Sequence, residues 1–282
     1  MDAWKTTWTR RGTNMCWPQA WLPEDLGEEK VRVLSASYDF AASHWGKQGQ
    51  KMQEVQKFGS SLLEQIIHGD GAWLNDSDKF VLVGHSFGGL VIKSLFVEAS
   101  KHNDDKCKKF LKCIKGTIFY SVPHSGDLIA QYIKNFNKAF HQRLAGTLSN
   151  LSVFEAEMKK LSKDYEDKIE TLSKDLHHAI RGIKIFSFAE QRDYNKVLVL
   201  PWDSGSKFTG NGMILDANHD DICKPSERWD PGYQKLLEIL ELILGEDDND
   251  HTSTSAVNSS TSRKDSKRSR FLKRSIGTYL VH

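Results

Sequence analysis

The run Phe80-Val81-Leu82-Val83 leads directly into Gly84-His85-Ser86-Phe87-Gly88 and then into Gly89-Leu90-Val91-Ile92. A short, continuous apolar run is typical of a strand in a parallel sheet whose two faces are both covered. The residues from about 89 to 100 follow a helical pattern. The stretch therefore predicts a strand, a sharp turn and a helix, which is the context in which the pattern G-x-S-x-G presents a reactive serine.

Ser86 is the candidate nucleophile of this turn. A strained turn would point its hydroxyl out of the sheet, and the glycines on either side would let the strand and the helix approach closely. The backbone N–H of Phe87, at the start of the helix, is the candidate donor to an oxyanion.

In the rest of the chain, predicted strands alternate with predicted helices. Apolar or β-branched runs predict strands at 31–34, 117–122, 183–188, 197–200 and 213–215, and amphipathic patterns predict helices at 51–67 and 233–244. Strands that alternate with helices indicate an α/β fold with a mostly parallel sheet and helices on both faces.

The segment 127–181 is a helical insertion, too long for a simple crossover between two strands. Two interpretations stay open: a helix packed on the body, or a functional element that caps a pocket or binds a partner. One helical face carries apolar residues at spacings of three and four, namely Leu151, Phe154, Met158, Leu161, Tyr165, Ile169, Leu172 and Leu176.

A serine nucleophile needs a histidine base and an acid that orients it, in the chain order serine, acid, histidine. Only His219, His251 and His282 lie far enough along the chain, and the last two fall in the C-terminal tail. His219 is therefore the candidate base. His85 and His124 are expected to line the pocket or to hold turns.

Two carboxylates compete for the role of the acid. Glu190 directly follows the strand predicted at 183–188, where the fold usually places this group, and Asp203 lies further on. Asp193 and Asp216 are weaker candidates. Chain order favours Glu190 over Asp203, and both stay candidates.

The composition is that of a globular protein. The chain has 282 residues, 39% of them hydrophobic, and a net charge of +2, which excludes wholesale disorder and gives no electrostatic case for nucleic acid. No apolar run approaches the roughly 18 residues that cross a bilayer, and the N-terminus lacks the pattern of a secretory signal. The four cysteines fit no zinc or redox spacing. We therefore expect free thiols in a reducing compartment and no metal or organic cofactor.

The charge pattern divides the chain into a domain over 1–245 and a tail over 246–282. The tail begins with acidic residues at 246–250, continues through a Ser/Thr/Asn stretch and turns basic at 263–274. Such a segment is expected to be mostly disordered. Its basic part is a candidate for peripheral contact with an anionic membrane.

Five separated segments of the chain resemble a single family, the serine-active-site-containing (SERAC-like) family of lipase-like α/β hydrolases. The resemblance runs in order from the first residues to about residue 244. The segments are Cys16–Leu26, Gly84–Gly89, Gly116–Gly126, Ser187–Glu190 and Asn218–Pro225.

The resemblance implies an α/β-hydrolase fold with Ser86 as nucleophile and His219 as base, and it supports Glu190 as the acid. It further implies a lipid acyl hydrolase or transacylase in the remodelling of phospholipids such as phosphatidylglycerol, at the mitochondrion or the endoplasmic reticulum. The sequence alone favours the cytoplasm. The alternative function is that of a catalytically weak or inactive hydrolase-fold protein that binds or scaffolds.

One feature of the family is missing from the start of this chain. Family members carry an apolar strand that ends in His-Gly just before the part that resembles 2–8, where this chain has only Met1. We therefore expect a shortened or diverged copy, with a gap in the sheet between the strands at 31–34 and 80–83. Because the His-Gly loop supplies an oxyanion donor, we also expect impaired activity.

Overall fold

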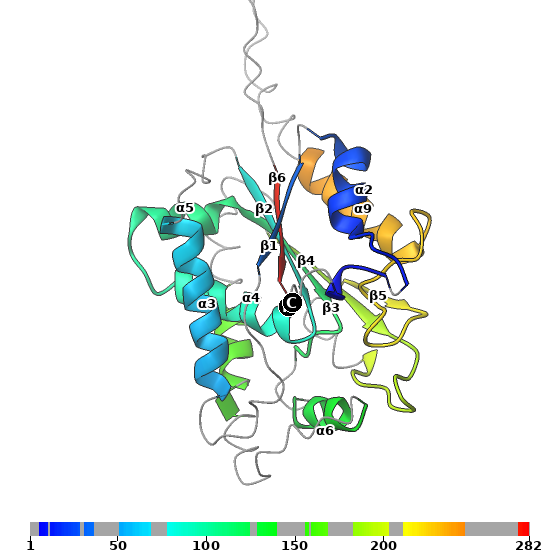
Figure 1. The fold of residues 1–282 in the computed structure, drawn as a ribbon. Coiled ribbons are helices and arrows are strands. Elements are labelled where there is room, and N and C mark those ends of the chain that lie inside the picture. The colour runs from blue at the N-terminus through cyan, green and yellow to red at the C-terminus, as the bar shows by residue number, and fades with distance from the viewer. Residues whose placement is uncertain are drawn as a thin grey trace, which may run out of the picture.

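The structure, a computed structural model, is an α/β fold in which helices cover both faces of one sheet (Figure 1). This architecture confirms the predicted α/β class with a mostly parallel sheet. The residues that the structure describes are 6–10, 12–28, 31–36, 51–68, 78–124, 129–139, 156–157, 159–168, 183–202, 211–245 and 276–281.

The described strands form one six-stranded sheet in which every neighbouring pair is parallel. Its order is β1-β6-β2-β3-β4-β5. The strands are β1 (Val31–Ala36), β2 (Lys79–His85), β3 (Ile114–Tyr120), β4 (Lys184–Glu190), β5 (Gly212–Leu215) and β6 (Ile276–Val281).

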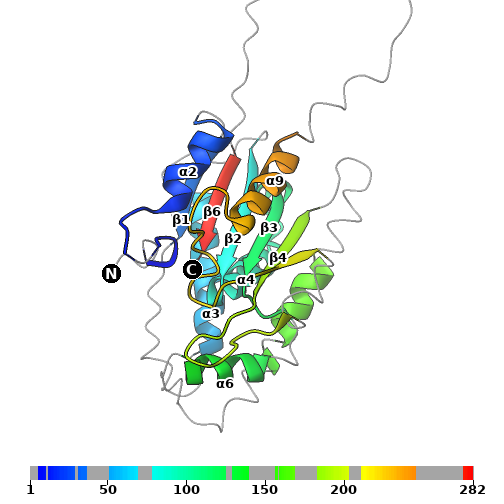
Figure 2. The same cartoon turned by 90° about the vertical axis from the view of Figure 1, so that its right-hand side faces the viewer.

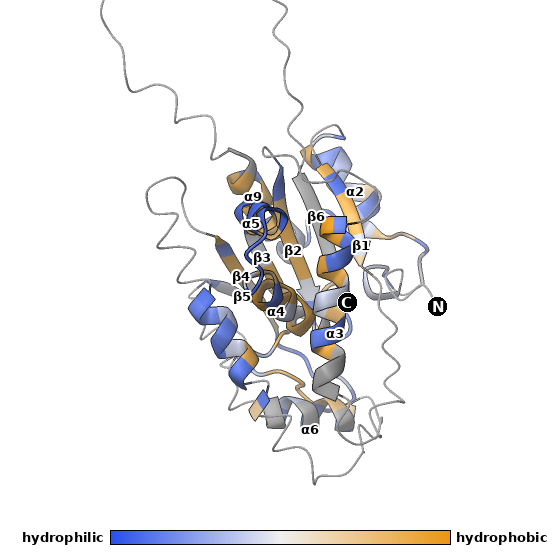
Figure 3. Ribbon diagram, turned by 90° about the vertical axis from the view of Figure 1, so that its left-hand side faces the viewer, coloured by the Kyte–Doolittle hydropathy of each residue, from blue (hydrophilic) through white to orange (hydrophobic). Residues whose placement is uncertain are grey.

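Helices cover both faces of the sheet (Figure 3). The helices α3 (Lys51–His68), α4 (Phe87–Ala99) and α5 (Asp105–Cys113) pack on one face, and α2 (Trp17–Leu26) and α9 (Pro231–Gly245) pack on the other. Each face of the sheet therefore has its own hydrophobic core, and strand β2 contributes to both. Phe80 and Leu82 belong to the core on the α4 side, and Val81 and Val83 belong to the core on the α9 side. The continuous apolar run of β2 therefore faces two cores, as predicted.

The C-terminal strand β6 lies in the middle of the sheet, between β1 and β2. Thr278 is in register with Val33 on one side and with Val81 on the other. The predicted gap in the sheet is therefore wrong, because the backbone edges of β1 and β2 are both paired. The tail, which is expected to be mostly disordered, contributes this strand at 276–281, and the rest of the tail lies outside the described residues.

Other differences from the predictions are local. The strand predicted at 197–200 is absent from the sheet, since Val197 makes only an isolated bridge with Tyr194. The helices α2 and α5 were not predicted. Helix α2 contains Pro23, a residue that usually ends a helix, and it has no strong apolar stripe.

The insertion contributes two described parts. Helix α6 (Ile129–Ala139) lies beyond the carboxyl ends of the strands (Figure 2). The helical residues 159–168 pack on the body through Leu161 and Tyr165, which belong to the core on the α4 side. The remaining residues of the predicted apolar stripe, Leu151, Phe154, Met158, Ile169, Leu172 and Leu176, lie outside the described residues.

The structure also bears on the membrane and on the cysteines. Across the described parts of the chain, no helix combines the length and the apolar character that a bilayer crossing requires.

All four cysteines are free thiols, and Cys107, Cys113 and Cys223 are buried.

Candidate active site

Ser86 stands at the sharp turn between β2 and α4. Its φ of 53° and ψ of −121° are unusual for a residue other than glycine, and its N–H donates to the carbonyl of Tyr120 at 2.9 Å. The turn also brings strand and helix together, because a Cβ on Gly84 would come within 2.9 Å of the Gly89 backbone. The local sequence thus builds the strained turn that presents the serine hydroxyl.

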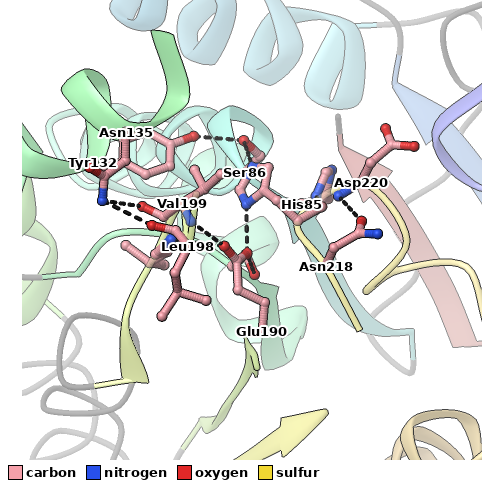
Figure 4. A network of polar contacts seen from close by, with 12 residues as sticks. His85, Ser86, Tyr132, Asn135, Glu190, Leu198, Val199, Asn218 and Asp220 are labelled. Atoms are coloured by element: carbon pink, nitrogen blue, oxygen red, sulfur yellow. Dashed lines mark hydrogen bonds and ion pairs between the residues drawn. The ribbon is translucent and has the colours of Figure 1, made fainter. Parts of the chain in front are cut away.

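A chain of hydrogen bonds connects Ser86, His219 and Glu190. Figure 4 labels Ser86 and Glu190, the two ends of this chain. The Nε2 atom of His219 lies 3.0 Å from Ser86 Oγ, and its Nδ1 atom lies 2.7 Å from Glu190 Oε2. Only 8% of Ser86, 1% of His219 and 2% of Glu190 is exposed. Three residues that are far apart in the sequence therefore meet in a buried site.

The loop after β5 positions His219. The side-chain oxygen of Asn218 accepts the backbone N–H groups of Asp220 and Asp221, both at 3.0 Å. These bonds form a turn around His219. The side chain of His85 also contacts this loop, with Nε2 2.8 Å from the His219 carbonyl oxygen.

The carboxylate of Glu190 accepts hydrogen bonds at both oxygens. Besides the bond from His219, Oε2 accepts the hydroxyl of Ser121 at 2.6 Å, while Oε1 accepts the N–H groups of Val199 and Leu200 at 2.8 Å each. Burial alone would raise the pKa of Glu190, but the His219 ring and these donors hold the pKa below its ordinary value. Glu190 is therefore ionised at neutral pH and can hold His219 with Nδ1 protonated.

Two of the other candidate acids, Asp193 and Asp216, are exposed, unlike Glu190. Asp216 forms an exposed ion pair with Arg192, and Asp193 is exposed. Asp203 lies outside the described residues.

The two candidate pocket histidines have different surroundings. His85 lines a cavity of about 490 Å³ that is otherwise formed by N-terminal residues between 6 and 14 and by Asp220 and Lys224. His124 is buried, with Nε2 3.0 Å from Ser187 Oγ and its ring against Phe119. Burial lowers the pKa of both, to about 3 for His85, so both rings are neutral at physiological pH.

Sequence reasoning missed several partners of these three residues. Ser121, with a φ of 47°, follows β3 and was placed inside a predicted strand. Tyr132, on α6, has its hydroxyl 2.6 Å from Ser86 Oγ. A tyrosine in a helical insertion carries no local signal of that contact. A serine just past the carboxyl end of a central strand is a weak signal that could have marked Ser121.

Phe87 begins α4, as its predicted role as oxyanion donor requires, and its side chain is buried. Among the described residues, no cluster of three His, Cys, Asp or Glu side chains is arranged to hold a metal ion.

Comparisons with known proteins point to one group of relatives. The chain is 30% identical to Protein SERAC1 of Bos taurus over 239 residues, which is 82% of this chain and 34% of that protein. It is also 28% identical to Protein SERAC1 of Homo sapiens over 239 residues, which is 82% of this chain and 34% of that protein. With Protein SERAC1 of Danio rerio the identity is 28% over 257 residues, which is 86% of this chain and 35% of that protein. The chain thus spans about a third of the length of these curated relatives.

The remaining comparisons give no match. No protein-family profile and no solved structure matches the chain. The curated relatives nevertheless confirm the resemblance to SERAC-like proteins that the five sequence segments indicated.

Proposed function

We propose that this SERAC-like chain has the α/β-hydrolase fold and is a serine hydrolase that acts on carboxylic esters. The observation that carries the proposal is the hydrogen-bonded chain from Ser86 Oγ through both ring nitrogens of His219 to Glu190. An activated serine requires a base within hydrogen-bond reach and an acid that holds the base in the correct tautomer. The distances of 3.0 and 2.7 Å meet both requirements.

Each residue then has a role in acyl transfer. His219 takes the proton of Ser86 as Oγ attacks the ester carbonyl, and it later gives this proton to the departing alcohol. Glu190 stabilises the imidazolium that forms. The N–H of Phe87 donates to the oxyanion. Water or an acceptor alcohol releases the acyl group from Ser86, which gives hydrolysis or transacylation.

The surroundings of His219 suit an apolar acyl chain. The rings of Tyr132 and Phe136 lie 6.1 and 5.8 Å from the His219 ring. Together with the resemblance to lipase-like proteins, this aromatic enclosure supports a lipid ester as the substrate, of the phosphatidylglycerol type. The same resemblance supports action at the mitochondrion or the endoplasmic reticulum, with the basic segment 263–274 as the contact to an anionic membrane.

One observation favours a second candidate function, that of a binding or scaffold protein. Only 8% of Ser86 is exposed, and the hydroxyl of Tyr132, on α6, lies 2.6 Å from the hydroxyl of Ser86. A site that stays closed in this way would not turn over substrate. The two functions differ in whether the serine reacts.

Covalent labelling with a fluorophosphonate probe separates these two functions, because the probe reports an activated serine without knowledge of the substrate. We expect the full chain to be labelled and Ser86→Ala to be unlabelled. Ser94→Ala, which alters another buried serine on α4, is the control and should label like the original chain. Absence of labelling in the folded, unaltered chain would favour the scaffold function.

A further inference from the structure

The hydroxyl of Ser86 has a second partner besides His219. Tyr132 Oη lies 2.6 Å from Ser86 Oγ, compared with 3.0 Å for His219 Nε2 (Figure 4). Tyr132 belongs to α6 and is 5% exposed. The nucleophilic oxygen therefore lies between a ring nitrogen and a phenol.

The positions of the protons follow from the network. The Glu190 carboxylate can only accept a hydrogen from Nδ1 of His219, so a His219 ring that acts as a base presents Nε2 as the acceptor. Ser86 must then donate its only hydrogen to Nε2, which leaves Tyr132 as the donor to Ser86 Oγ. Burial raises the pKa of Tyr132 above its ordinary value, so the phenol keeps its hydrogen at neutral pH.

We propose that the hydroxyl of Tyr132 is a catalytic group that donates a hydrogen bond to the oxyanion formed during acyl transfer, beside the N–H of Phe87. This inference rests on the proposed function. When Oγ bonds to the carbonyl carbon, the carbonyl electron pair moves to its oxygen, and the proton of Ser86 passes to His219 Nε2. The oxyanion is bonded to the same carbon as Oγ, so a donor on Oγ can turn to it. When the intermediate collapses, the bond to the alcohol breaks and His219 protonates that alcohol, while Tyr132 keeps its own hydrogen.

The segment 195–200 holds helix α6 in place, and the same segment also binds Glu190. The side-chain N–H of Asn135 donates to the Leu198 carbonyl at 2.9 Å, and Asn195 donates to the carbonyl of Ala139 at 2.6 Å. The adjoining N–H groups of Val199 and Leu200 bind Glu190. Tyr132 and the acid thus share one support, and a helix fixed in advance limits the reorganisation during the reaction to the turn of the Tyr132 hydroxyl from Oγ to the oxyanion.

The contact has a competing explanation, in which Tyr132 is only a latch that blocks Ser86 in a closed state. The two explanations predict opposite effects of removing the hydroxyl. Without an oxyanion donor the reaction slows, whereas without a latch the serine becomes more reactive.

The test compares Tyr132→Phe with the matched variant Tyr165→Phe in the full chain. Tyr165 is also a buried tyrosine of the insertion, and its hydroxyl bonds to Thr117 at 3.0 Å, away from Ser86. For Tyr132→Phe we expect the kcat for a p-nitrophenyl ester to fall by about 10²–10³ with little change in KM. Tyr165→Phe should keep the original kcat.

Two further measurements separate chemistry from folding. Rates are expressed per serine titrated to completion with the fluorophosphonate, so that a partly folded variant does not imitate slow chemistry. A trifluoromethyl ketone, which forms a tetrahedral oxyanion adduct with a serine, should lose affinity for Tyr132→Phe by the same factor as kcat/KM.

The outcomes are distinct. If the unaltered chain labels and hydrolyses the ester but Tyr132→Phe is equally fast or faster, the oxyanion role is wrong and the serine hydrolase stands. If the unaltered chain neither labels nor hydrolyses, the proposed function fails, and the role of Tyr132 fails with it.

Discussion

Ser121 donates its hydroxyl hydrogen to Glu190 Oε2 at 2.6 Å, and the same oxygen accepts the Nδ1 hydrogen of His219 at 2.7 Å. Ser121 is completely buried at the end of β3 and adopts a φ of 47°. Its hydroxyl therefore holds the one carboxylate oxygen that bonds to His219, the proposed base. Ser121 does not contact the nucleophile in this arrangement, so we regard it as a positioning residue.

Replacing Ser121 by alanine should slow the reaction without abolishing it. A hydrogen bond to a charged group contributes about 1.5–3 kcal/mol to stability. If its loss disturbs the orientation of His219 enough to raise the activation barrier by roughly 1.4 kcal/mol, the rate falls by a factor of ten. We expect the fluorophosphonate labelling rate and kcat to fall by about tenfold or more, with KM little changed.

Ser187→Ala is the matched control for this prediction. Ser187 is another buried serine, on the neighbouring strand β4, and it bonds to His124 at 3.0 Å rather than to Glu190. It should keep the original labelling rate. Equal rates for Ser121→Ala and the unaltered chain would show that the remaining donors suffice to hold Glu190.

The variant Glu190→Gln tests whether Glu190 is the acid that orients His219. The carboxylate accepts four hydrogen bonds in the described structure, from His219, Ser121, Val199 and Leu200. An amide offers only one acceptor oxygen and would leave part of these donors without a partner, so we expect a lower melting temperature. It would also stop favouring the catalytic tautomer of His219. By analogy with serine proteases, kcat should fall on the order of 10³–10⁴-fold.

The control for Glu190→Gln is Asp216→Asn, which removes a carboxylate that pairs with Arg192 at the surface. It should leave kcat unchanged. If Glu190→Gln, counted per titrated serine, stays within tenfold of the unaltered chain, a different carboxylate serves His219. Asp203 would then be the first to examine.

The sequence was sufficient to predict the parts of the fold and site that depend on local pattern. The run Phe80–Val83 and the turn at Ser86 are such a local pattern, and chain order led to His219 and Glu190. The hydroxyls of Ser121 and Tyr132 could not be predicted in the same way. Their contacts depend on where the end of β3 and the insertion lie in space, which no local periodicity encodes.

The position of β6 could not be predicted for a different reason. The residues Ile276–Val281 include β-branched and aromatic types that favour a strand, but they follow a long polar and basic segment. Composition over the whole tail therefore indicated disorder. The position of β6 depends on the backbone groups of β1 and β2, with which it pairs on its two sides. Their availability is a property of the sheet and cannot be read from the tail sequence.

A proline at position 278 tests the position of β6. Thr278 pairs with strands on both sides, so proline would remove a backbone donor from the middle of the sheet, where proline is normally excluded. A buried carbonyl left without its donor costs about 1–3 kcal/mol. We expect a clear loss of melting temperature for Thr278→Pro. Thr278→Val keeps a β-branched side chain and the N–H, and it should melt close to the unaltered chain. If proline and valine give the same melting temperature, β6 does not lie between β1 and β2.

Lys93 is a buried amine on α4 that belongs to the support of the insertion. Its Nζ atom donates to the carbonyl of Pro123 at 3.0 Å and lies 3.3 Å from Ser162 Oγ. Burial lowers the pKa of Lys93 to about 7, and the carboxylate of Glu166 opposes this shift without cancelling it. A neutral amine has two hydrogens, one for each of these oxygens, so the site fits the uncharged form.

This lowered pKa makes stability depend on pH in a defined direction. Between about pH 7 and the ordinary lysine pKa of about 10.4, the unfolded chain binds this proton and the folded chain does not. The free energy of unfolding therefore contains a contribution that rises with pH across this window, by up to about 1.4 kcal/mol per pH unit. Below pH 7 the folded chain carries the full cost of a buried charge.

Lys93→Met removes the titrating group while keeping a side chain of similar length. We expect the stability of the unaltered chain, minus that of Lys93→Met, to increase between pH 7 and pH 10, as measured by urea denaturation at several pH values. Lys101→Met, at an exposed lysine just after α4, is the control, and its curve should stay parallel to that of the unaltered chain. Parallel curves for Lys93→Met as well would mean that Lys93 keeps its charge inside the folded protein, and the contacts with Pro123 and Ser162 would then be those of an ammonium group.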